Sequence, residues 1–413
     1  MTCRGMMLVT SLPVSMVALP AIAQPGASPA ASSQTIREID DLFASALAKR
    51  AMQGASVTIA WDDGTVLTRT YGSADGTPAQ PATGETLFRY GSISKLFTSL
   101  AILKLAEENR IELDAPVASI FPGQEPYSRY PGSVTVRRLL NHTSGLADFS
   151  PEEILAKVDR GYVVEQDYVS VLSRPMSYEP GAEWVYSDAP FRLLSMIVEK
   201  ASGVSYGEFI TKNLAPRLNL HSVRLCEPGT ANHAAGFVSR NSKLSPERAY
   251  SIRGLLGEGG LCGSTADLAR LPGEVKNGHW VSSAALDQML EITRLTDGVE
   301  IDYGLGVRRG WLGHFRTWGH TGGGPDGSWA AFAHYPERNV TVAVAANGTG
   351  SAIDAVTLQA AVAAIILGIP RPLTEALDAA DARQLTGAYA RRGRISCIGV
   401  DGRGEHRTKV GSA

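Results

Sequence analysis

Segments with β-strand character occur at both ends of the sequence, and a long, mostly helical pattern lies between them. Near the N-terminus, residues 55–61 and 66–71 flank an Asp-Gly turn, which predicts a β-hairpin. Near the C-terminus, residues 329–335 and 340–346 form a second β-rich pair, separated by four turn residues. Apolar residues at helical spacing dominate from 92 to about 290. One sheet can therefore form only if strands from both ends come together.

This order of segments predicts an α/β fold with an antiparallel sheet flanked by helices. We expect the α/β part to comprise residues 35–91 and 300–368, with a mostly helical part, 92–299, inserted between them. The chain of 413 residues is 44% apolar and 19% charged, which is enough for a large core. Within the tail, 371–413, residues 384–389 fit the first strand of an extension, whereas residues 391–413 look too polar and too short to fold alone. The sequence assigns no role to this tail.

The first residues have the pattern of an export signal. Arg4 supplies a positive charge, residues 6–19 are mostly apolar, and Ala21-Ile22-Ala23 is a small-x-small cleavage site. We therefore expect residues 1–23 to be a cleaved signal peptide and residues 24–34 to be a disordered linker. The mature protein is expected to be bacterial, periplasmic or secreted, without a stable membrane anchor.

Composition excludes some functions. The net charge is −2 and long Lys/Arg runs are absent, so nucleic acid is not an expected partner. Of the four cysteines, Cys3 leaves with the signal, and Cys226 and Cys262 of the remaining three share one loop-rich region. An odd count in an exported protein suggests one disulfide and one free thiol, so we expect Cys226 and Cys262 to pair. The eight histidines show no metal-ligand spacing, and neither a metal nor another cofactor is expected.

Ser92 and Lys95 stand three residues apart at the start of an apolar helical stretch. Positions i and i+3 share one face of a helix, so the hydroxyl and the amine can meet. A desolvated lysine, held neutral or sharing a proton with the hydroxyl, can make a serine nucleophilic without a histidine. The alternative is a serine that caps the helix beside a solvated lysine. Partner motifs elsewhere in the chain decide between the two.

Two later segments supply such partners. Tyr186 precedes a predicted helix, and near a lysine ammonium its hydroxyl can serve as a base or proton shuttle. Taken alone, it can equally be a packing tyrosine beside a helix-capping Asp188. His320 lies in a glycine-rich strand edge with Thr321, where backbone N–H groups can hold an oxyanion.

Taken together and in this order, these motifs resemble the serine β-lactamase and penicillin-binding-protein-like family. The similarity is to the branch with class C β-lactamases, D-alanyl-D-alanine carboxypeptidases, D-aminopeptidases and esterases. It covers roughly residues 36–368, within an expected hydrolase domain of 35–370. The motifs that carry it are Gly91-Ser92-Ile93-Ser94-Lys95, Leu139-Leu140-Asn141-His142-Thr143-Ser144-Gly145-Leu146, Tyr186-Ser187-Asp188, Tyr303-Gly304-Leu305-Gly306 and His320-Thr321-Gly322.

The resemblance implies a serine β-lactamase-like fold and a two-step acyl transfer without cofactors. Ser92 would attack a carbonyl of a small molecule or peptide, with Lys95 and Tyr186 handling its proton. The backbone N–H groups of Ser92 and Gly323 would hold the oxyanion. The residues expected to bind substrate are Asp188, His320, Thr321 and Gly322.

Two departures from the family pattern bear on the substrate. Asp188 stands where many members have asparagine, and an ionised aspartate accepts hydrogen bonds but donates none. His320 replaces a lysine, and a histidine is mostly neutral near pH 7. The leading hypothesis is an exported hydrolase of esters, amides or small, including D-configured, peptides. The alternatives are a true class C-like β-lactamase and a catalytically poor penicillin-binding or sensor protein.

A second serine motif is excluded by its context. Gly203-Val204-Ser205-Tyr206-Gly207 matches the Gly-x-Ser-x-Gly pattern of α/β-hydrolases, which requires a strand before the serine. A helix precedes Ser205 here, and Glu208 three residues later completes a helix-capping box. We therefore interpret Ser205 as structural.

Overall fold

The computed structural model describes most of the chain between residues 31 and 412. The described residues are 31–150, 152–153, 165–240, 243–247, 250–252, 254–348 and 354–371, together with the backbone of 387–391, 394–400 and 406–412. The expected signal peptide and most of the expected linker lie outside these ranges. The first helix, α1 (Ser33–Ala48), begins two residues before the expected end of the linker because the Ser32 side chain caps it.

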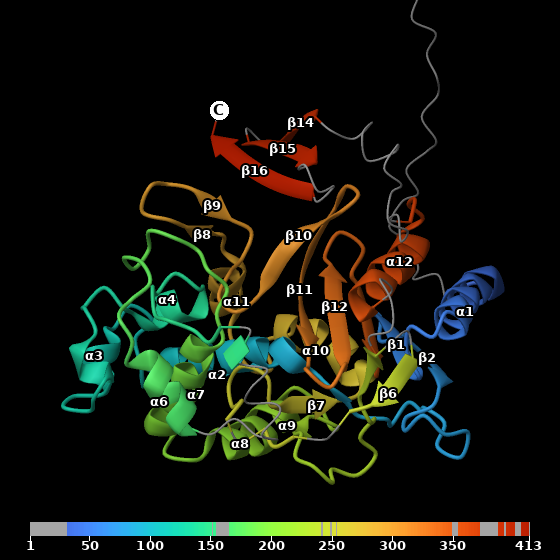
Figure 1. Ribbon diagram of the computed structural model, residues 1–413, viewed down its shortest axis with the longest axis horizontal. Coiled ribbons are helices and arrows are strands. Elements are labelled where there is room, and N and C mark those ends of the chain that lie inside the picture. The colour runs from blue at the N-terminus through green and yellow to red at the C-terminus, as the bar shows by residue number, and fades with distance from the viewer. Residues whose placement is uncertain are drawn as a thin grey trace, which may run out of the picture.

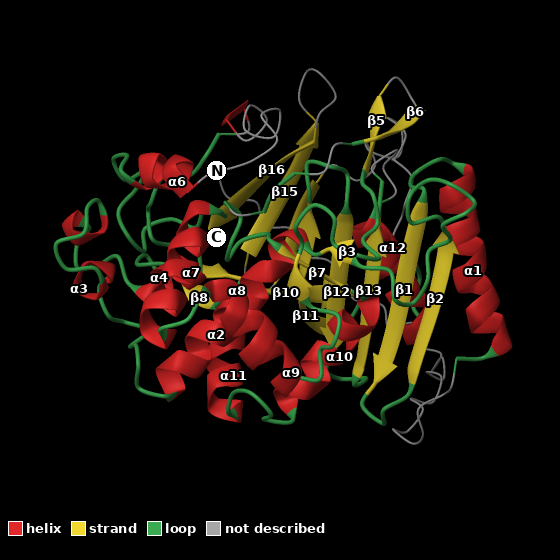
Figure 2. Ribbon diagram, turned by 90° about the horizontal axis from the view of Figure 1, so that it is seen from below, coloured by secondary structure: helices red, strands yellow, loops and turns green. Residues whose placement is uncertain are grey.

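A six-stranded antiparallel sheet joins the two ends of the chain (Figures 1 and 2). Its order is β10-β11-β12-β13-β1-β2, so the N-terminal hairpin pairs with the last C-terminal strand. The strands are β1 (Gly54–Trp61), β2 (Val66–Gly72), β10 (Arg308–Leu312), β11 (Phe315–Gly323), β12 (Trp329–Tyr335) and β13 (Val340–Ala346). The predicted α/β class with an antiparallel sheet is therefore confirmed.

Helices cover both faces of this sheet. In β13, Val342 and Val344 pack into a core shared with α1 and α12 (Ala355–Leu367). The alternating residues Ala343 and Ala345 belong to a second core on the side of the helical region. Because side chains alternate along a strand, a strand with two helical layers is buried at every position. All seven residues of β13 are accordingly buried.

The region between the two sheet-forming ends is mostly helical and surrounds α2 (Ser94–Glu107). Eleven residues of α2 are buried, so this helix is enclosed on nearly every side. The other helices are α3 (Val117–Ile120), α4 (Val136–Leu140), α6 (Glu165–Leu172), α7 (Ala189–Ser202), α8 (Tyr206–Glu208), α9 (Ala215–Arg217), α10 (Thr265–Lys276) and α11 (Ser283–Leu290). Short strands interrupt them: β3 (Phe88–Arg89), β4 (Arg224–Leu225), β5 (Phe237–Arg240), β6 (Lys243–Pro246), β7 (Leu261–Gly263), β8 (Thr293–Arg294) and β9 (Glu300–Ile301). The predicted division of the chain into an α/β part and a helical part, at residues 92 and 299, stays a prediction. Helix α10, from the expected helical part, packs directly on the sheet.

The tail forms more regular structure than its composition suggests. A separate three-stranded antiparallel sheet contains β14 (Gly387–Arg391), β15 (Arg394–Val400) and β16 (His406–Ser412). Strand β14 overlaps the strand expected at 384–389, and the expectation that residues 391–413 do not fold alone stays a prediction. Across the described ranges, no helix combines the length and the apolar character needed to cross a membrane.

The expected disulfide is wrong. Cys226 and Cys262 are free thiols, both fully buried, in a small core with Tyr250 and Ile252. Burial raises the pKa of the Cys226 thiol, and its contact with Cys262 raises that pKa further. The two thiols therefore behave as small apolar side chains that fill the core.

A buried ion pair connects the segment before Ser92 to the sheet. Arg89 on β3 lies 3.0 Å from the carboxylate of Asp326, in the turn between β11 and β12, and both side chains are at most 4% exposed. The Arg89 guanidinium also stacks 4.3 Å from the centroid of the Tyr250 ring. A charge at this depth is tolerated only with its partner present.

We expect Asp326→Ala to lower the free energy of unfolding by about 3–5 kcal/mol, because it leaves the Arg89 charge buried and unpaired. Urea unfolding measures this loss. The control is Glu337→Ala, which breaks the exposed Arg316–Glu337 pair and should cost less than about 1 kcal/mol. Equal losses in the two variants would contradict this role of the buried pair.

Candidate active site

Two glycines bring Ser92 against strand β11. Ser92 lies in a 3-10 turn, Gly91–Ile93, that leads into α2. A Cβ at Gly91 would lie 2.7 Å from the Gly323 nitrogen, and a Cβ at Gly322 would lie 2.7 Å from the Ser92 nitrogen. Both distances are too short for any other residue, and Gly91 has a φ of +50°. The structure therefore places the predicted oxyanion residues, Ser92 and Gly323, in neighbouring segments.

Lys95 is a fully buried cation with three acceptors. Its Nζ donates to the Ser92 hydroxyl (3.1 Å), to the Asp188 carboxylate (2.5 Å) and to the backbone carbonyl of Glu258 (3.3 Å). An ammonium has three protons, and each acceptor here takes one. Burial is the largest single effect and lowers the pKa of Lys95, but Asp188, Tyr186 and Glu258 together outweigh it and raise that pKa above the ordinary value. This geometry favours a cationic Lys95 that is paired with Asp188 and shares a proton with Ser92, over a neutral lysine base.

A second acid, Asp148, binds the backbone at Asp188. The backbone N–H groups of Asp188 and Ala189 donate to the carboxylate of Asp148, which caps the start of α7. Burial raises the pKa of Asp148 to about 6, and the neighbouring charge of Asp188 adds to this effect. The side chain of Glu258 is buried beside them, accepts from the Tyr168 hydroxyl, and has its pKa raised well above normal by burial. Among these acids, Asp188 is the direct counter-ion of Lys95.

The Tyr186 hydroxyl is buried and makes no hydrogen bond to any residue that the structure describes. The Lys95 Nζ lies 5.0 Å from the centroid of the Tyr186 ring. Burial raises the pKa of this phenol, and the Lys95 charge opposes the rise. Ser92 and Lys95 both act to lower the pKa of Tyr186, so the Tyr186 oxygen lies close to the proposed nucleophile and its cation.

His320 does not offer a free N–H to a substrate. Its Nδ1 lies 2.6 Å from the Thr321 carbonyl, and its Nε2 lies 3.1 Å from the Tyr303 hydroxyl. Burial, together with the charges of Arg308 and Lys95, lowers the pKa of His320 to about 3. The expectation that His320 binds a substrate carboxylate is therefore corrected, because the ring is neutral and both nitrogens are occupied.

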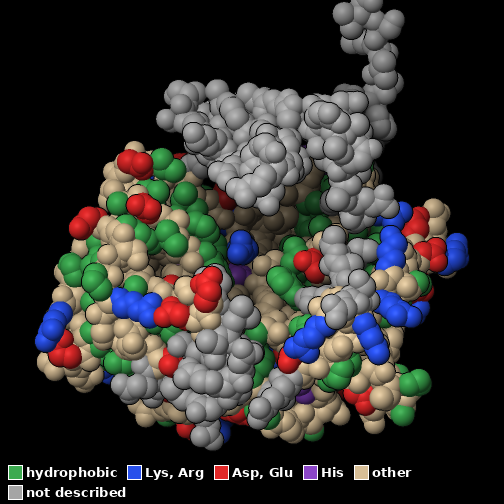
Figure 3. Space-filling model, viewed as in Figure 1, with side chains coloured by type: hydrophobic (Ala, Val, Ile, Leu, Met, Phe, Trp, Pro, Cys, Tyr) green, Lys and Arg blue, Asp and Glu red, His purple; other side chains and the backbone are tan. Residues whose placement is uncertain are grey.

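Arg308 is the charged residue that the sequence analysis missed. It is exposed at the start of β10, and its guanidinium carbon lies 5.2 Å from the centroid of the Tyr186 ring. It forms no ion pair with any described acid. On the face of the molecule seen in Figure 3, basic and histidine side chains lie together in a central hollow. The only sequence signal for Arg308 is its place just after the Tyr303-Gly304-Leu305-Gly306 motif.

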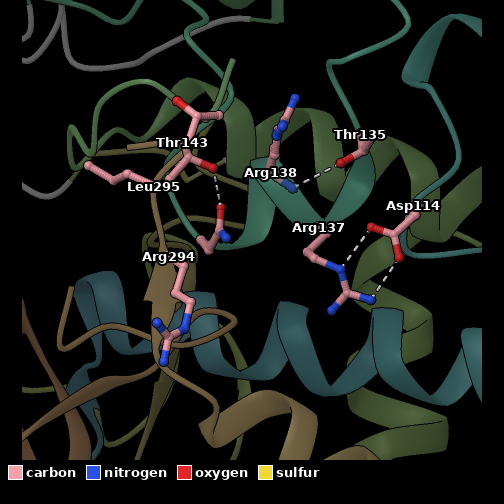
Figure 4. Close-up of a pocket in the computed structure, with 10 residues that line it drawn as sticks. Asp114, Thr135, Arg137, Arg138, Thr143, Arg294 and Leu295 are labelled. Carbon is pink, nitrogen blue, oxygen red and sulfur yellow. Dashed lines mark hydrogen bonds and ion pairs between the residues drawn. The ribbon is translucent and has the colours of Figure 1, made fainter. Parts of the chain in front are cut away.

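A separate polar cavity of about 330 Å³ lies elsewhere in the helical region (Figure 4). It is lined by Arg138, Thr143 and Arg294, and by Arg137, which binds Asp114 through two hydrogen bonds. None of the predicted catalytic residues lines it. Across the described part of the chain, no cluster of His, Cys, Asp or Glu side chains could hold a metal ion.

Ser205 is structural, as its context predicts. Its hydroxyl accepts the backbone N–H of Glu208 at 3.2 Å and caps α8. No lysine or histidine contacts it in the described structure.

Known proteins agree with this arrangement. The Beta-lactamase family model matches residues 39–365. The chain is 29% identical over 345 residues to penicillin-binding protein 4* of Bacillus subtilis (strain 168), covering 77% of this chain and 75% of that protein. It is 32% identical over 183 residues to esterase EstB of Burkholderia gladioli, covering 40% of this chain and 45% of the esterase.

Solved structures share the fold. The octameric penicillin-binding protein homologue from Pyrococcus abyssi matches with a TM-score of 0.70 and 24% identity, over 91% of this chain and 90% of that one. D-amino acid amidase from Ochrobactrum anthropi SV3 matches with a TM-score of 0.69 and 20% identity, over 81% and 98%. The chain belongs to the Beta-lactamase family and is a serine hydrolase of that family.

We expect Asp188→Asn to move the acidic limb of the pH profile of kcat/KM toward lower pH. The charge of Asp188 raises the pKa of both Lys95 and Tyr186, so an uncharged amide of the same shape lowers both. Measuring kcat/KM for ester hydrolysis at a series of pH values locates the acidic limb of the profile. Asp114→Asn, in the separate cavity, serves as the control and should leave the limb in place. A limb that stays fixed or moves upward in Asp188→Asn would contradict the assigned counter-ion.

Proposed function

We propose that the protein hydrolyses esters, amides or small peptides through an acyl-enzyme on Ser92. The observation that carries this proposal is the contact between the Lys95 ammonium and the Ser92 hydroxyl, beside the unpartnered hydroxyl of Tyr186. A cation that donates to a serine oxygen stabilises its alkoxide form, and a nearby phenol can carry the proton.

In the acylation step, Ser92 Oγ attacks the substrate carbonyl while its proton passes to the oxygen of a minor phenolate form of Tyr186, which the Lys95 charge stabilises against the effect of burial. The backbone N–H groups of Ser92 and Gly323 hold the oxyanion. The bond from the carbonyl carbon to the leaving group then breaks, and Tyr186 returns the proton to the leaving alcohol or amine. In the second step, water gives its proton to Tyr186, attacks the acyl carbon and releases the acid, and Ser92 regains a proton.

The substrate class is the finer part of the proposal. Relatives include an esterase, a D-amino acid amidase and penicillin-binding proteins, which favours ester, amide or D-configured peptide bonds. Arg308 is the exposed cation beside Tyr186, so we further propose that it attracts substrates bearing a carboxylate. We place this reaction outside the cytoplasm, on the basis of the export-signal pattern in residues 1–23.

We expect Ser92→Ala to abolish ester hydrolysis and Ser205→Ala to leave it largely intact. Incubation with a fluorophosphonate followed by mass spectrometry should show one adduct, on the peptide that contains Ser92. An adduct on Ser205, or activity that survives Ser92→Ala, would refute the proposed nucleophile. Rapid turnover of a cephalosporin would support the β-lactamase alternative, and a stable penicillin adduct would support the penicillin-binding alternative.

We expect Arg308→Ala to raise KM for a carboxylate-bearing ester about 10-fold or more, with a much smaller change for the matched neutral ester. The neutral ester is the internal control, since both compounds need the same chemistry at Ser92. An equal change for both esters would show that Arg308 acts on the reaction centre and not on substrate charge.

A further inference from the structure

Three buried rings form a continuous chain of hydrogen bonds behind Tyr186. His142 Nε2 lies 3.0 Å from the Tyr303 hydroxyl, and the same hydroxyl lies 3.1 Å from His320 Nε2. All three side chains are at most 1% exposed. Two of them, His142 and Tyr303, come from motifs to which the catalytic scheme above gives no task, and His320 lies on the oxyanion strand β11.

Backbone groups at the two ends of this hydrogen-bond chain fix which atom donates in each of its bonds. The Ser187 N–H donates to His142 Nδ1 (3.2 Å), so that nitrogen carries no proton and Nε2 must carry one. His142 Nε2–H therefore donates to the Tyr303 oxygen, and the Tyr303 O–H donates to His320 Nε2. The remaining proton of His320, on Nδ1, donates to the Thr321 carbonyl. Every donor has one acceptor, and both histidines are neutral.

A protonated ring at either position would break this pattern. A proton on His142 Nδ1 would face the Ser187 N–H, donor against donor. A proton on His320 Nε2 would face the Tyr303 hydroxyl and leave its O–H without an acceptor. Burial, together with the positive charges of Lys95 and Arg308, also lowers the pKa of both histidines.

The two ends of this hydrogen-bond chain contact different segments of the site. Ser187 stands between Tyr186 and Asp188, whereas Thr321 lies on β11, two residues before the oxyanion residue Gly323. The His142 ring also packs on the Tyr186 ring, with centroids 4.5 Å apart. In addition, His142 has a φ of +62°, a left-handed conformation that few residues other than glycine adopt, so the surrounding contacts hold it in place.

We propose that His142, Tyr303 and His320 form a neutral positioning relay that fixes the Tyr186 segment relative to the oxyanion strand. His142 and Tyr303 are then positioning residues, and His320 belongs to this relay instead of binding substrate. The inference rests on the proposed function, because it gives the relay the task of holding Tyr186 at the distance that proton transfer to and from Ser92 requires. The ionisable or charged groups that face the relay are Lys95, Arg308, Tyr186 and Asp188.

The first test measures the tautomers directly and needs no enzymatic activity. In protein labelled with ¹⁵N-histidine, we expect His142 as the Nε2–H tautomer and His320 as the Nδ1–H tautomer, with neither ring titrating between about pH 5 and 9. Signals are assigned by their loss in His142→Gln and His320→Asn. The reverse tautomers, or a cationic ring at neutral pH, would overturn the relay even if the enzyme proves active.

The second test measures the effect on the reaction. Tyr303→Phe removes one hydroxyl from the relay, and we expect kcat for a chromogenic ester to fall about 10- to 100-fold while KM changes less than about threefold. The control is Tyr335→Phe, which removes a buried hydroxyl that accepts from Gln359 in the other core and should leave kcat unchanged. Equal kcat values in the two variants would overturn the positioning role. Because the tautomers are read separately, absence of any hydrolase activity would count against the proposed function alone.

Discussion

The fully buried ammonium of Lys95 is the constraint on which the rest of the site depends. A cation inside a protein is tolerated only when nearby groups replace the water that it has lost. Here those groups are the Ser92 hydroxyl, the Asp188 carboxylate and the Glu258 carbonyl, which come from three segments far apart in the sequence. The contact that stabilises the Lys95 charge also holds the Ser92 hydroxyl in place. The stability of the buried ammonium and the reactivity of the serine therefore depend on the same hydrogen bonds.

The site has two walls, and hydrogen bonds within the fold connect them. The proposed reaction uses neither a metal nor a cofactor. One wall is the glycine-rich end of β11, which approaches Ser92 closely because Gly91 and Gly322 carry no Cβ. The other is the segment that carries Tyr186, tied to the first wall by the relay through His142. A proton passed between Ser92 and Tyr186 travels across the space between the walls, so its rate depends on their separation.

Local spacing and motif order were sufficient to predict the fold class and to find Ser92, Lys95 and Tyr186. The strands of both sheet-forming ends could also be predicted, because β-branched or aromatic residues mark them. Strands β10 and β11 were harder to recognise, since their glycines lower strand propensity, although Gly322 of β11 is needed for close approach to Ser92. The protonation states could not be predicted, because they depend on partners distant in sequence. Asp188 makes Lys95 a lasting cation, and Tyr303 occupies the nitrogen of His320 that a substrate would otherwise use.

The most direct test of this account is the charge of Lys95 in the folded protein. Heteronuclear NMR of labelled lysine side chains, with the Lys95 signal identified by its loss in Lys95→Arg, reports whether the amine is protonated at each pH. The account predicts that Lys95 remains an ammonium at and above the ordinary lysine pKa of 10.5, because Asp188 holds its charge. A Lys95 signal that titrates near neutral pH would contradict the account and restore the lysine as the base that activates Ser92.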